Sequence, residues 1–536
     1  MSLSLTLLDW IVGTIVLGGS MVIGLYISLR ARSSESSSGF FLAGRRMTWP
    51  IVGGSLYATN IGAEHLVGLS GDAYRYGLCA GTVELTTAIC LGFACAVLFP
   101  YYIRNKVYTI PEFLELRYNR AARTFFSGLM LVISIMTKMA FCLFAGALVL
   151  HGLVGWDVMA TVAALGLLTA VFTIVGGFAA VAFTDSIQTV IMIIGCGAMT
   201  LIGLHQIGGW HELVARVPEA MHIAKPYTDP IYPFWGVIAG AVYGGIFYWG
   251  IDQVNVQRVL GAPDLRQARW GAMCCVLLKL TPVFIFALPG VIAFALHPGL
   301  HGDETKQTFV LLLNRLLPTG MRGFVLAALS AALTSSLTSV MNSVATMAVR
   351  DFILPHRPGM SERAQVVIGR VVILVATALG VGAAYLVYKS PEGLYKYLQT
   401  ISIYLVLPVT PAIVFGIVSR RVTFAGAVAS VGVGVALSAL FVFDQLVGPE
   451  TGARLFPWLH TTLTQNYTYR GLWGTLATTL TLFLVSACTR KTDTEKLERT
   501  TIHWGRKPEP FEGLKDWRLH LAALGIATVL LYSWVW

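Results

Sequence analysis

Residues 55–68 read SLYATNIGAEHLVG and lie in the middle of a long apolar segment. A Thr-Asn pair, a glycine and a Glu-His pair fall near its centre, where an unbroken lipid-facing helix would carry apolar side chains. Such a sequence favours a discontinuous membrane helix, whose freed carbonyl groups can bind a cation. The alternative is a kinked helix inside a bundle, with its polar side chains paired.

The rest of the chain has the composition of a polytopic membrane protein. Of 536 residues, 56% are hydrophobic and only 12% are charged, whereas a soluble domain carries about 25% charged residues. This composition excludes an ordinary soluble enzyme and a disordered chain. The apolar segments are continuous rather than alternating, which argues against a β-barrel. They predict about fourteen transmembrane helices of about 20 residues each.

The net charge of +11 is explained by the distribution of the basic residues. If the first helix enters from outside, most of the lysine and arginine residues fall in inner connections, such as those containing Arg45, Arg104, Arg258, Arg266 and Arg420. The positive-inside rule then places both termini outside a cell membrane, either a plasma membrane or a bacterial inner membrane. No nucleic-acid partner is needed to account for the charge.

Motifs of catalysis do not stand out. The chain has no Walker A motif, no Ser/His/Asp, Cys/His or paired-carboxylate arrangement, and no metal-ligand spacing among its eight cysteines. The cysteines are interpreted as small packing residues. We therefore expect a protein that is not an enzyme.

Polar side chains also interrupt other predicted spans. They are Glu84, Tyr248, Trp249, Asp252, Lys279 and Gln399. Donors and acceptors beside aromatic rings suit a polyhydroxylated ligand, because hydroxyls need both and a ring covers the apolar side of a sugar. The alternative for each residue is an internal ion pair or helix–helix hydrogen bond, for example Lys279 with Glu84 or Asp252.

A hydroxyl-rich helix and a membrane carboxylate suggest a cation site. Residues 334–339 read TSSLTS, and hydroxyl and carbonyl oxygens are ligands of hard cations. Close helix packing by small residues is the alternative. Asp185 is a second candidate for cation binding, and the alternative is a charge at a solvated helix end or at a helix N-terminus.

Several segments in order then carry a resemblance to a known family. They are FLAGR at 41–45, residues 58–71, YTIPEF at 108–113, residues 248–258 and residues 335–342. With these segments the chain resembles the sodium/solute symporter family, and within it the sodium–glucose cotransporter branch. The resemblance implies an all-α, leucine-transporter-like fold with two inverted repeats of five helices, at 49–206 and 234–418. One helix in 1–48 would precede them, and three helices in 422–536 would follow.

The resemblance also implies site residues. A first sodium ion would be bound by the carbonyls of Ala58, Ile61 and Ala332 and the hydroxyls of Ser335 and Ser336. A sugar pocket would contain Asn60, His65, Glu84, Tyr248, Trp249, Lys279 and Gln399, under a lid of Leu69, Val83 and Tyr395. A second sodium ion would be bound by Asp185, Thr338 and Ser339, because carriers of this branch that couple two sodium ions have threonine at the position of Thr338.

We therefore expect sodium-coupled symport of a neutral hexose, glucose or galactose, by alternating access. Sodium, the sugar and the lipid bilayer are the expected partners, with no obligate protein partner. Transport of another polyol such as myo-inositol, or of a sialic acid, is the nearest alternative, although an anion would call for an added arginine in the pocket. A further alternative is a non-transporting sugar sensor or a sodium-leak channel on the same fold.

Overall fold

The computed structural model describes residues 5–30, 35–62, 64–229, 231–389, 409–461, 467–503 and 509–533, which form helices and no β-strand. The first half contains α1 (Leu7–Arg30), α2 (Ser37–Leu42), α3 (Trp49–Asn60), α4 (Ser70–Tyr76), α5 (Thr87–Phe93), α6 (Phe99–Arg104), α7 (Ile110–Arg117), α8 (Arg120–Ile133), α9 (Ala140–Val154), α10 (Val158–Ile207) and α11 (Trp210–Arg216). The second half contains α12 (Phe234–Gly250), α13 (Gln253–Leu260), α14 (Leu265–Leu278), α15 (Leu288–Leu296), α16 (Thr308–Leu316), α17 (Met321–Met347), α18 (Glu362–Lys389), α20 (Val409–Val418), α21 (Phe424–Val447), α22 (Pro449–Leu455), α23 (Tyr467–Ala487), α24 (Thr494–Thr500) and α25 (Trp517–Ser533).

The helices have the lengths of membrane spans. Among the described residues, eight helices are long and apolar enough to cross a bilayer. The bent pair of α12 and α13 makes a ninth if it is counted as one span. The predicted all-helical polytopic fold is confirmed. The expected number of about fourteen spans stays a prediction, because a broken span such as α3–α4 does not form one long helix and residues 390–408 lie outside the described part.

Two spans are broken in the middle. Helix α3 ends at Asn60, and Ile61 has an extended backbone with φ −83° and ψ 112°. The chain becomes helical again in a π-helical segment, Glu64–Leu69, that leads into α4. The second break separates α12 from α13, whose axes differ by 51°. The discontinuous helix predicted from residues 55–68 is confirmed.

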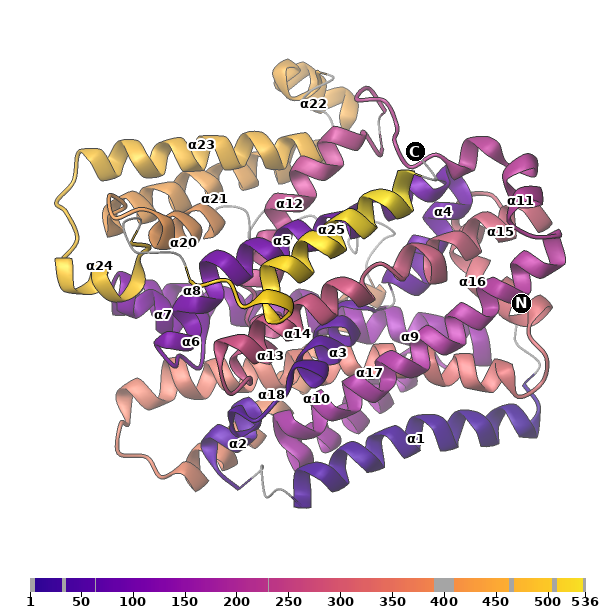
Figure 1. Ribbon diagram of the computed structural model, residues 1–536, viewed down its shortest axis with the longest axis horizontal. Coiled ribbons are helices and arrows are strands. Elements are labelled where there is room, and N and C mark those ends of the chain that lie inside the picture. The colour runs from indigo at the N-terminus through magenta and orange to yellow at the C-terminus, as the bar shows by residue number, and fades with distance from the viewer. Residues whose placement is uncertain are drawn as a thin grey trace.

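The hydroxyl-rich helix α17 forms the centre of the bundle. Of the membrane-length helices described, it is the most deeply buried. It packs against α1, α3, α10 and α18 (Figure 1). Its alanine, serine and threonine side chains permit close approach of the neighbouring backbones. The hydroxyls of residues 334–339 therefore face other helices rather than lipid.

The first helix is fixed to the start of α17 by a buried carboxylate. Asp9 Oδ1 accepts hydrogen bonds from the backbone N–H groups of Gly320 and Gly323, at 2.7 and 3.1 Å. A negative charge is favourable at this position, because the free N–H groups of a helix N-terminus carry positive partial charge. A Cβ on Gly323 would lie 2.0 Å from the carbonyl oxygen of Asp9. Only glycine allows this contact between the two backbones.

We expect Gly323→Ala to lower the free energy of unfolding by about 1–3 kcal/mol, because the added methyl group must push α1 away from α17. Gly19→Ala in α1 is the matched control, since no atom lies within 4 Å of its added Cβ. The control should be neutral or slightly stabilising. Thermal unfolding of the two variants in the same detergent measures the difference. Equal melting temperatures would contradict the close contact.

The C-terminal helix belongs to the same bundle. Helix α25 packs against α14 and α5 (Figure 1). The segment before α25 is tied to the beginning of α14 by two ion pairs, Arg269–Glu509 at 2.5 Å and Arg266–Glu512 at 2.9 Å. The eight cysteines form no disulfide; five are buried, Cys142 and Cys274 are partly buried, and Cys488 is exposed.

Candidate functional site

The broken end of α3 meets the hydroxyl-rich helix. Ser336 Oγ donates to the carbonyl oxygens of Thr59 and Ile61, both at 3.4 Å. These carbonyls lie where α3 ends, so the backbone exposes oxygen atoms toward α17. Three oxygen atoms from buried residues converge here, which fits the ligand chemistry of a hard cation.

The other predicted ligands of the first sodium ion are placed differently. Ala58 and Ala332 are both buried completely beside this point. Ser335 is also buried, but its hydroxyl donates to Asp185 Oδ1 at 2.6 Å rather than to the break. Ser336 thus forms a hydrogen bond with Ile61, whereas Ser335 belongs to a neighbouring cluster around Asp185.

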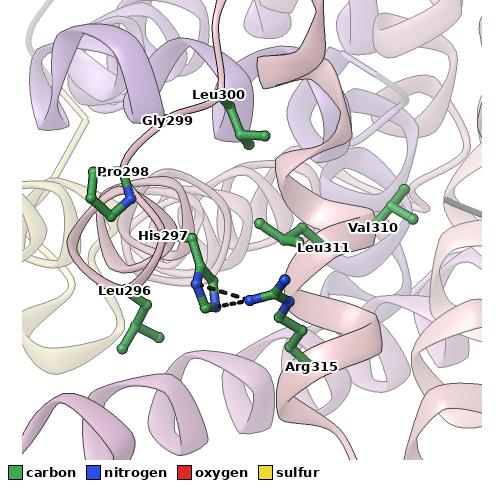
Figure 2. Close-up of a pocket in the computed structure, with 8 residues that line it drawn as sticks. All are labelled: Leu296, His297, Pro298, Gly299, Leu300, Val310, Leu311 and Arg315. Carbon is green, nitrogen blue, oxygen red and sulfur yellow. Dashed lines mark hydrogen bonds between the residues drawn. The ribbon is translucent and has the colours of Figure 1, made fainter.

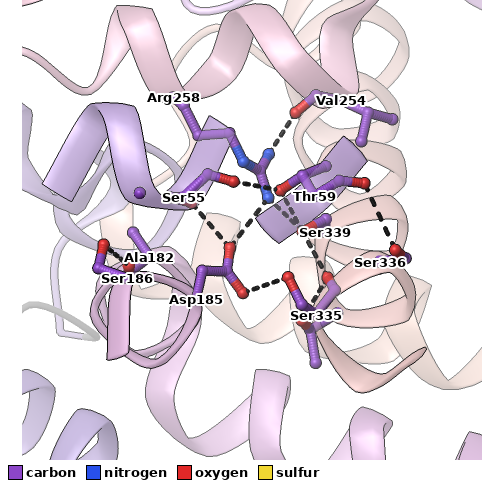
Figure 3. Close-up of polar contacts among 12 residues, drawn as sticks. Ser55, Thr59, Ala182, Asp185, Ser186, Val254, Arg258, Ser335, Ser336 and Ser339 are labelled. Carbon is purple, nitrogen blue, oxygen red and sulfur yellow. Dashed lines mark hydrogen bonds and ion pairs between the residues drawn. The ribbon is translucent and has the colours of Figure 1, made fainter. Parts of the chain in front are cut away.

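The carboxylate of Asp185 is the centre of that cluster (Figure 3). Ser55 Oγ donates to it at 2.7 Å, and Arg258 Nη2 lies 3.5 Å from the same carboxylate oxygen. Arg258 also donates to the hydroxyl of Ser339. Both charged side chains are at most 1% exposed. Such a pair compensates two charges that would be very costly to bury singly.

The cation beside Asp185 is therefore an arginine, which the sequence analysis placed in an inner connection. That interpretation of Arg258 is wrong, because the residue lies in the half-helix α13, which packs against α3 and α17 inside the bundle. Of the three residues predicted for the second sodium ion, Arg258 links Asp185 to Ser339. Thr338 Oγ1 instead donates to the carbonyl of Ser335 in its own helix, at 3.0 Å.

A second buried cluster contains the residues predicted for the solute. His65 Nε2 lies 3.1 Å from Glu84 Oε1. Lys279 pairs with the other oxygen of Glu84 and donates to Asn60 Oδ1. Lys279 is only 3% exposed. Of the two partners expected for Lys279, the structure places Glu84 beside it.

These four residues come from four segments. Asn60 ends α3, His65 lies in the π-helical segment after the break, Glu84 lies in the 3₁₀-helical run Leu78–Thr86, and Lys279 follows the last residue of α14. A carboxylate, an ammonium group, an imidazole and an amide provide acceptors and donors within one small volume. They can exchange their mutual hydrogen bonds for those of a polyhydroxylated molecule.

The aromatic residues of the predicted pocket lie on the other broken helix. Tyr248 and Trp249 pack edge to face, with ring centroids 5.0 Å apart. Their helix, α12, packs against the run that carries Glu84. Gln399 and Tyr395 lie outside the described residues. The lid residues Leu69 and Val83 are partly buried and exposed, respectively.

The break between α12 and α13 holds a further ion pair. Asp252 Oδ1 accepts from the N–H of Val254 and so caps α13. Its other oxygen pairs with Lys138, which lies in the π-helical segment Ser134–Met139 between α8 and α9. Asp252 is thus paired with Lys138 and not with Lys279.

A cavity of about 450 Å³ opens at the end of α15, away from the two clusters (Figure 2). Arg315 donates to the ring of His297 there, at 3.0 Å. Partial burial, and then the positive charge of Arg315, lower the pKa of His297 below its ordinary value. The cavity contains none of the residues predicted from the sequence. It offers aliphatic side chains and one cation, rather than the mixed donors and acceptors that a polyol needs.

Membrane-length helices broken at midspan, with paired charges and carbonyl groups at the breaks, define the class of secondary transporters. Comparisons with known proteins agree with this class. Residues 40–434 match the family model described as sodium:solute symporter family. The chain belongs to the sodium:solute symporter family.

Two relatives show the range of solutes named for similar proteins. The human sodium/myo-inositol cotransporter is 30% identical over 451 residues, which cover 76% of this chain and 63% of that protein. The sodium/glucose cotransporter 4 of Danio rerio is 33% identical over 527 residues, covering 90% of this chain and 78% of the relative. The chain therefore spans less than two thirds of the length of the myo-inositol cotransporter. The family and both relatives are transporters and not enzymes.

A solved structure confirms the fold. The substrate-bound, outward-open structure of a Na⁺-coupled sialic acid symporter superposes with a TM-score of 0.76 at 19% identity, covering 91% of this chain and 99% of that one. The leucine-transporter-like fold implied by the resemblance is thus confirmed for this chain.

Proposed function

We propose that this protein is a sodium-coupled symporter of a neutral hexose, glucose or galactose, that works by alternating access. The observation that carries the proposal is the position of two consecutive residues at the break of α3. The carbonyl of Ile61 accepts from Ser336, and the side chain of Asn60 accepts from Lys279 in the solute cluster. A cation held at Ile61 would therefore also fix Asn60, which links the two binding events.

The electrostatics of the solute cluster support a neutral solute. Its single carboxylate and single ammonium group are already paired, so an anion would meet Glu84 without an added cation. The second candidate is myo-inositol, because the human relative at 30% identity carries that name. Hexoses and inositol present similar rings of hydroxyl groups, and both fit a cluster of mixed donors and acceptors.

The energy of coupling is adequate for concentrative uptake. One sodium ion moving through 100 mV releases about 2.3 kcal/mol, and a tenfold gradient adds about 1.4 kcal/mol. Together they could sustain roughly 500-fold accumulation with perfect coupling. We also propose the second sodium site at Asp185, Thr338 and Ser339, which requires the guanidinium of Arg258 to withdraw from Asp185.

The domain arrangement stays part of this proposal. The break after α3 falls near the start of the repeat proposed at 49–206, and the break after α12 near the start of the one at 234–418. Matching breaks support inverted repeats. The outside location of both termini in a cell membrane rests on the positive-inside pattern.

Uptake into proteoliposomes tests the proposal. Labelled glucose, galactose and myo-inositol are supplied with an inward gradient of sodium or of potassium. We expect accumulation of at least one solute with sodium only. A simultaneous measurement of charge and solute should give two positive charges per solute, and one charge per solute would contradict the second sodium site. Binding without accumulation would favour the sensor, and no sodium stimulation for any solute would contradict symport.

Two substitutions separate the sites. His65→Ala should raise the solute KM about tenfold, because a hydrogen-bond partner of a charged group is lost. Ser336→Ala should raise the half-saturating sodium concentration by a similar factor, because one of the converging oxygen atoms is removed. Ser330→Ala is the matched control on the same helix, six residues before Ser336, and should leave both constants unchanged. Identical effects of Ser330→Ala and Ser336→Ala would contradict the assignment.

A further inference from the structure

Tyr532 near the end of α25 has a buried hydroxyl group that nothing so far explains. The residue is 5% exposed. No group among the described residues forms a hydrogen bond with its Oη atom. An unsatisfied hydroxyl at this depth is costly, so it indicates a partner that arrives in another state or a bound water.

Tyr532 shares a small cavity with residues of the solute cluster. A cavity of about 10 Å³ is lined by Tyr532 and Thr528 of α25 and by both members of the buried ion pair, Glu84 and Lys279. That volume holds roughly a single water molecule. The C-terminal helix thus contacts the solute cluster from the side of α14 and α5, against which it packs.

The ion pair must rearrange when a solute binds. Glu84 is now satisfied by His65 and Lys279, and Lys279 by Glu84 and Asn60. A polyol that takes hydrogen bonds from these groups must draw some of them apart, and each buried charge then needs a replacement partner. A phenol hydroxyl can donate to a carboxylate or accept from an ammonium group, so it can serve either ion.

We propose that Tyr532 is a positioning residue of the solute site. Directly, or through one water in the cavity, its hydroxyl donates to the carboxylate of Glu84 when the solute displaces the present partners of that carboxylate. Helix α25 then contributes to solute affinity, although it lies outside both proposed repeats. This inference rests on the proposed function and deepens it at the same site.

The test compares two deletions of a single hydroxyl group on α25. Tyr532→Phe keeps the ring and its packing. Ser533→Ala is the matched control, because Ser533 is exposed and, among the described residues, its hydroxyl donates only to the carbonyl of Leu530 in its own helix. Sodium-driven uptake of D-glucose, D-galactose and myo-inositol is measured in proteoliposomes, and sodium binding without solute is measured by thermal stabilisation in detergent.

We expect Tyr532→Phe to raise the KM of the transported solute about tenfold, with the maximum rate and the sodium-dependent stabilisation changed less than about twofold. Ser533→Ala should match the wild type. In a Glu84→Gln background, in which solute binding is read from thermal protection, Tyr532→Phe should have a much smaller effect, since the two residues act together.

Other outcomes overturn the inference. An unchanged KM in Tyr532→Phe would do so, as would an equal change in Ser533→Ala or a full effect in the Glu84→Gln background. Equal losses of rate and sodium stabilisation would assign Tyr532 to packing alone. If the wild type accumulates none of the three solutes with sodium, the proposed function fails and the inference with it. Uptake by the wild type with an unaffected Tyr532→Phe variant overturns the inference alone.

Discussion

We expect replacement of Lys279 with methionine to abolish solute uptake and to lower the free energy of unfolding by about 3–5 kcal/mol. The side chain of Lys279 is 3% exposed and that of Glu84 is 10% exposed, so solvent compensates either charge only weakly. Methionine has a similar length and stays apolar, which leaves Glu84 with His65 as its remaining partner. The stability loss is the cost of one uncompensated buried charge. Uptake in proteoliposomes and thermal unfolding in detergent measure the two effects.

A double variant separates the two roles of Lys279. Glu84→Gln together with Lys279→Met removes both charges, and we expect it to recover most of the stability while transport stays absent. Lys491→Met, at an exposed position, controls for the loss of a positive charge and should behave as the wild type. A Lys279→Met variant that melts with the wild type would show that the pair contributes nothing to the folded state.

The second large effect concerns Arg258. We expect Arg258→Met, measured without sodium, to lower the free energy of unfolding by about 3–5 kcal/mol, because Asp185 then remains charged and fully buried. Sodium should restore more stability to this variant than it adds to the wild type. The reason is that the guanidinium now lies against Asp185 and Ser339, where the second ion would have to bind. Melting temperatures in sodium and in choline chloride measure the difference.

The partner variant provides the control for Arg258. Asp185→Asn combined with Arg258→Met leaves no buried charge at this point, so stability should recover and the extra response to sodium should vanish. An Arg258→Met variant with the sodium response of the wild type would show that arginine and sodium do not compete for this place.

The sequence was sufficient for the break in α3 because that feature is local. Polar residues between Ser55 and Gly68 contradict a lipid-facing helix whatever surrounds them. An ion pair between Lys279 and a carboxylate could also be predicted from the sequence, because opposite charges in apolar spans must find partners. Pairing partners themselves depend on the packing, and the sequence left Glu84 and Asp252 as alternatives.

Other features depend on how the half-helices pack. Arg258 follows a predicted span and resembles a loop residue when charges are counted along the chain, but α13 carries it into the bundle. Thr338 was chosen by its position in a motif, whereas its hydroxyl bonds the carbonyl three residues earlier in α17, as threonine often does in helices. Tyr532 lies in a terminal helix with ordinary apolar neighbours, and only the packing of α25 brings it beside Glu84.

The burial of the cysteines makes the natural chain convenient for spectroscopy. A maleimide dye reacts with a thiolate in contact with water. Of the eight cysteines, Cys488 alone is exposed. It follows α23, and Ser486, two residues earlier, holds the start of α21 through Thr423. One fluorophore could therefore be attached to the unaltered protein, where it would report whether the C-terminal helices move when the central bundle changes its access.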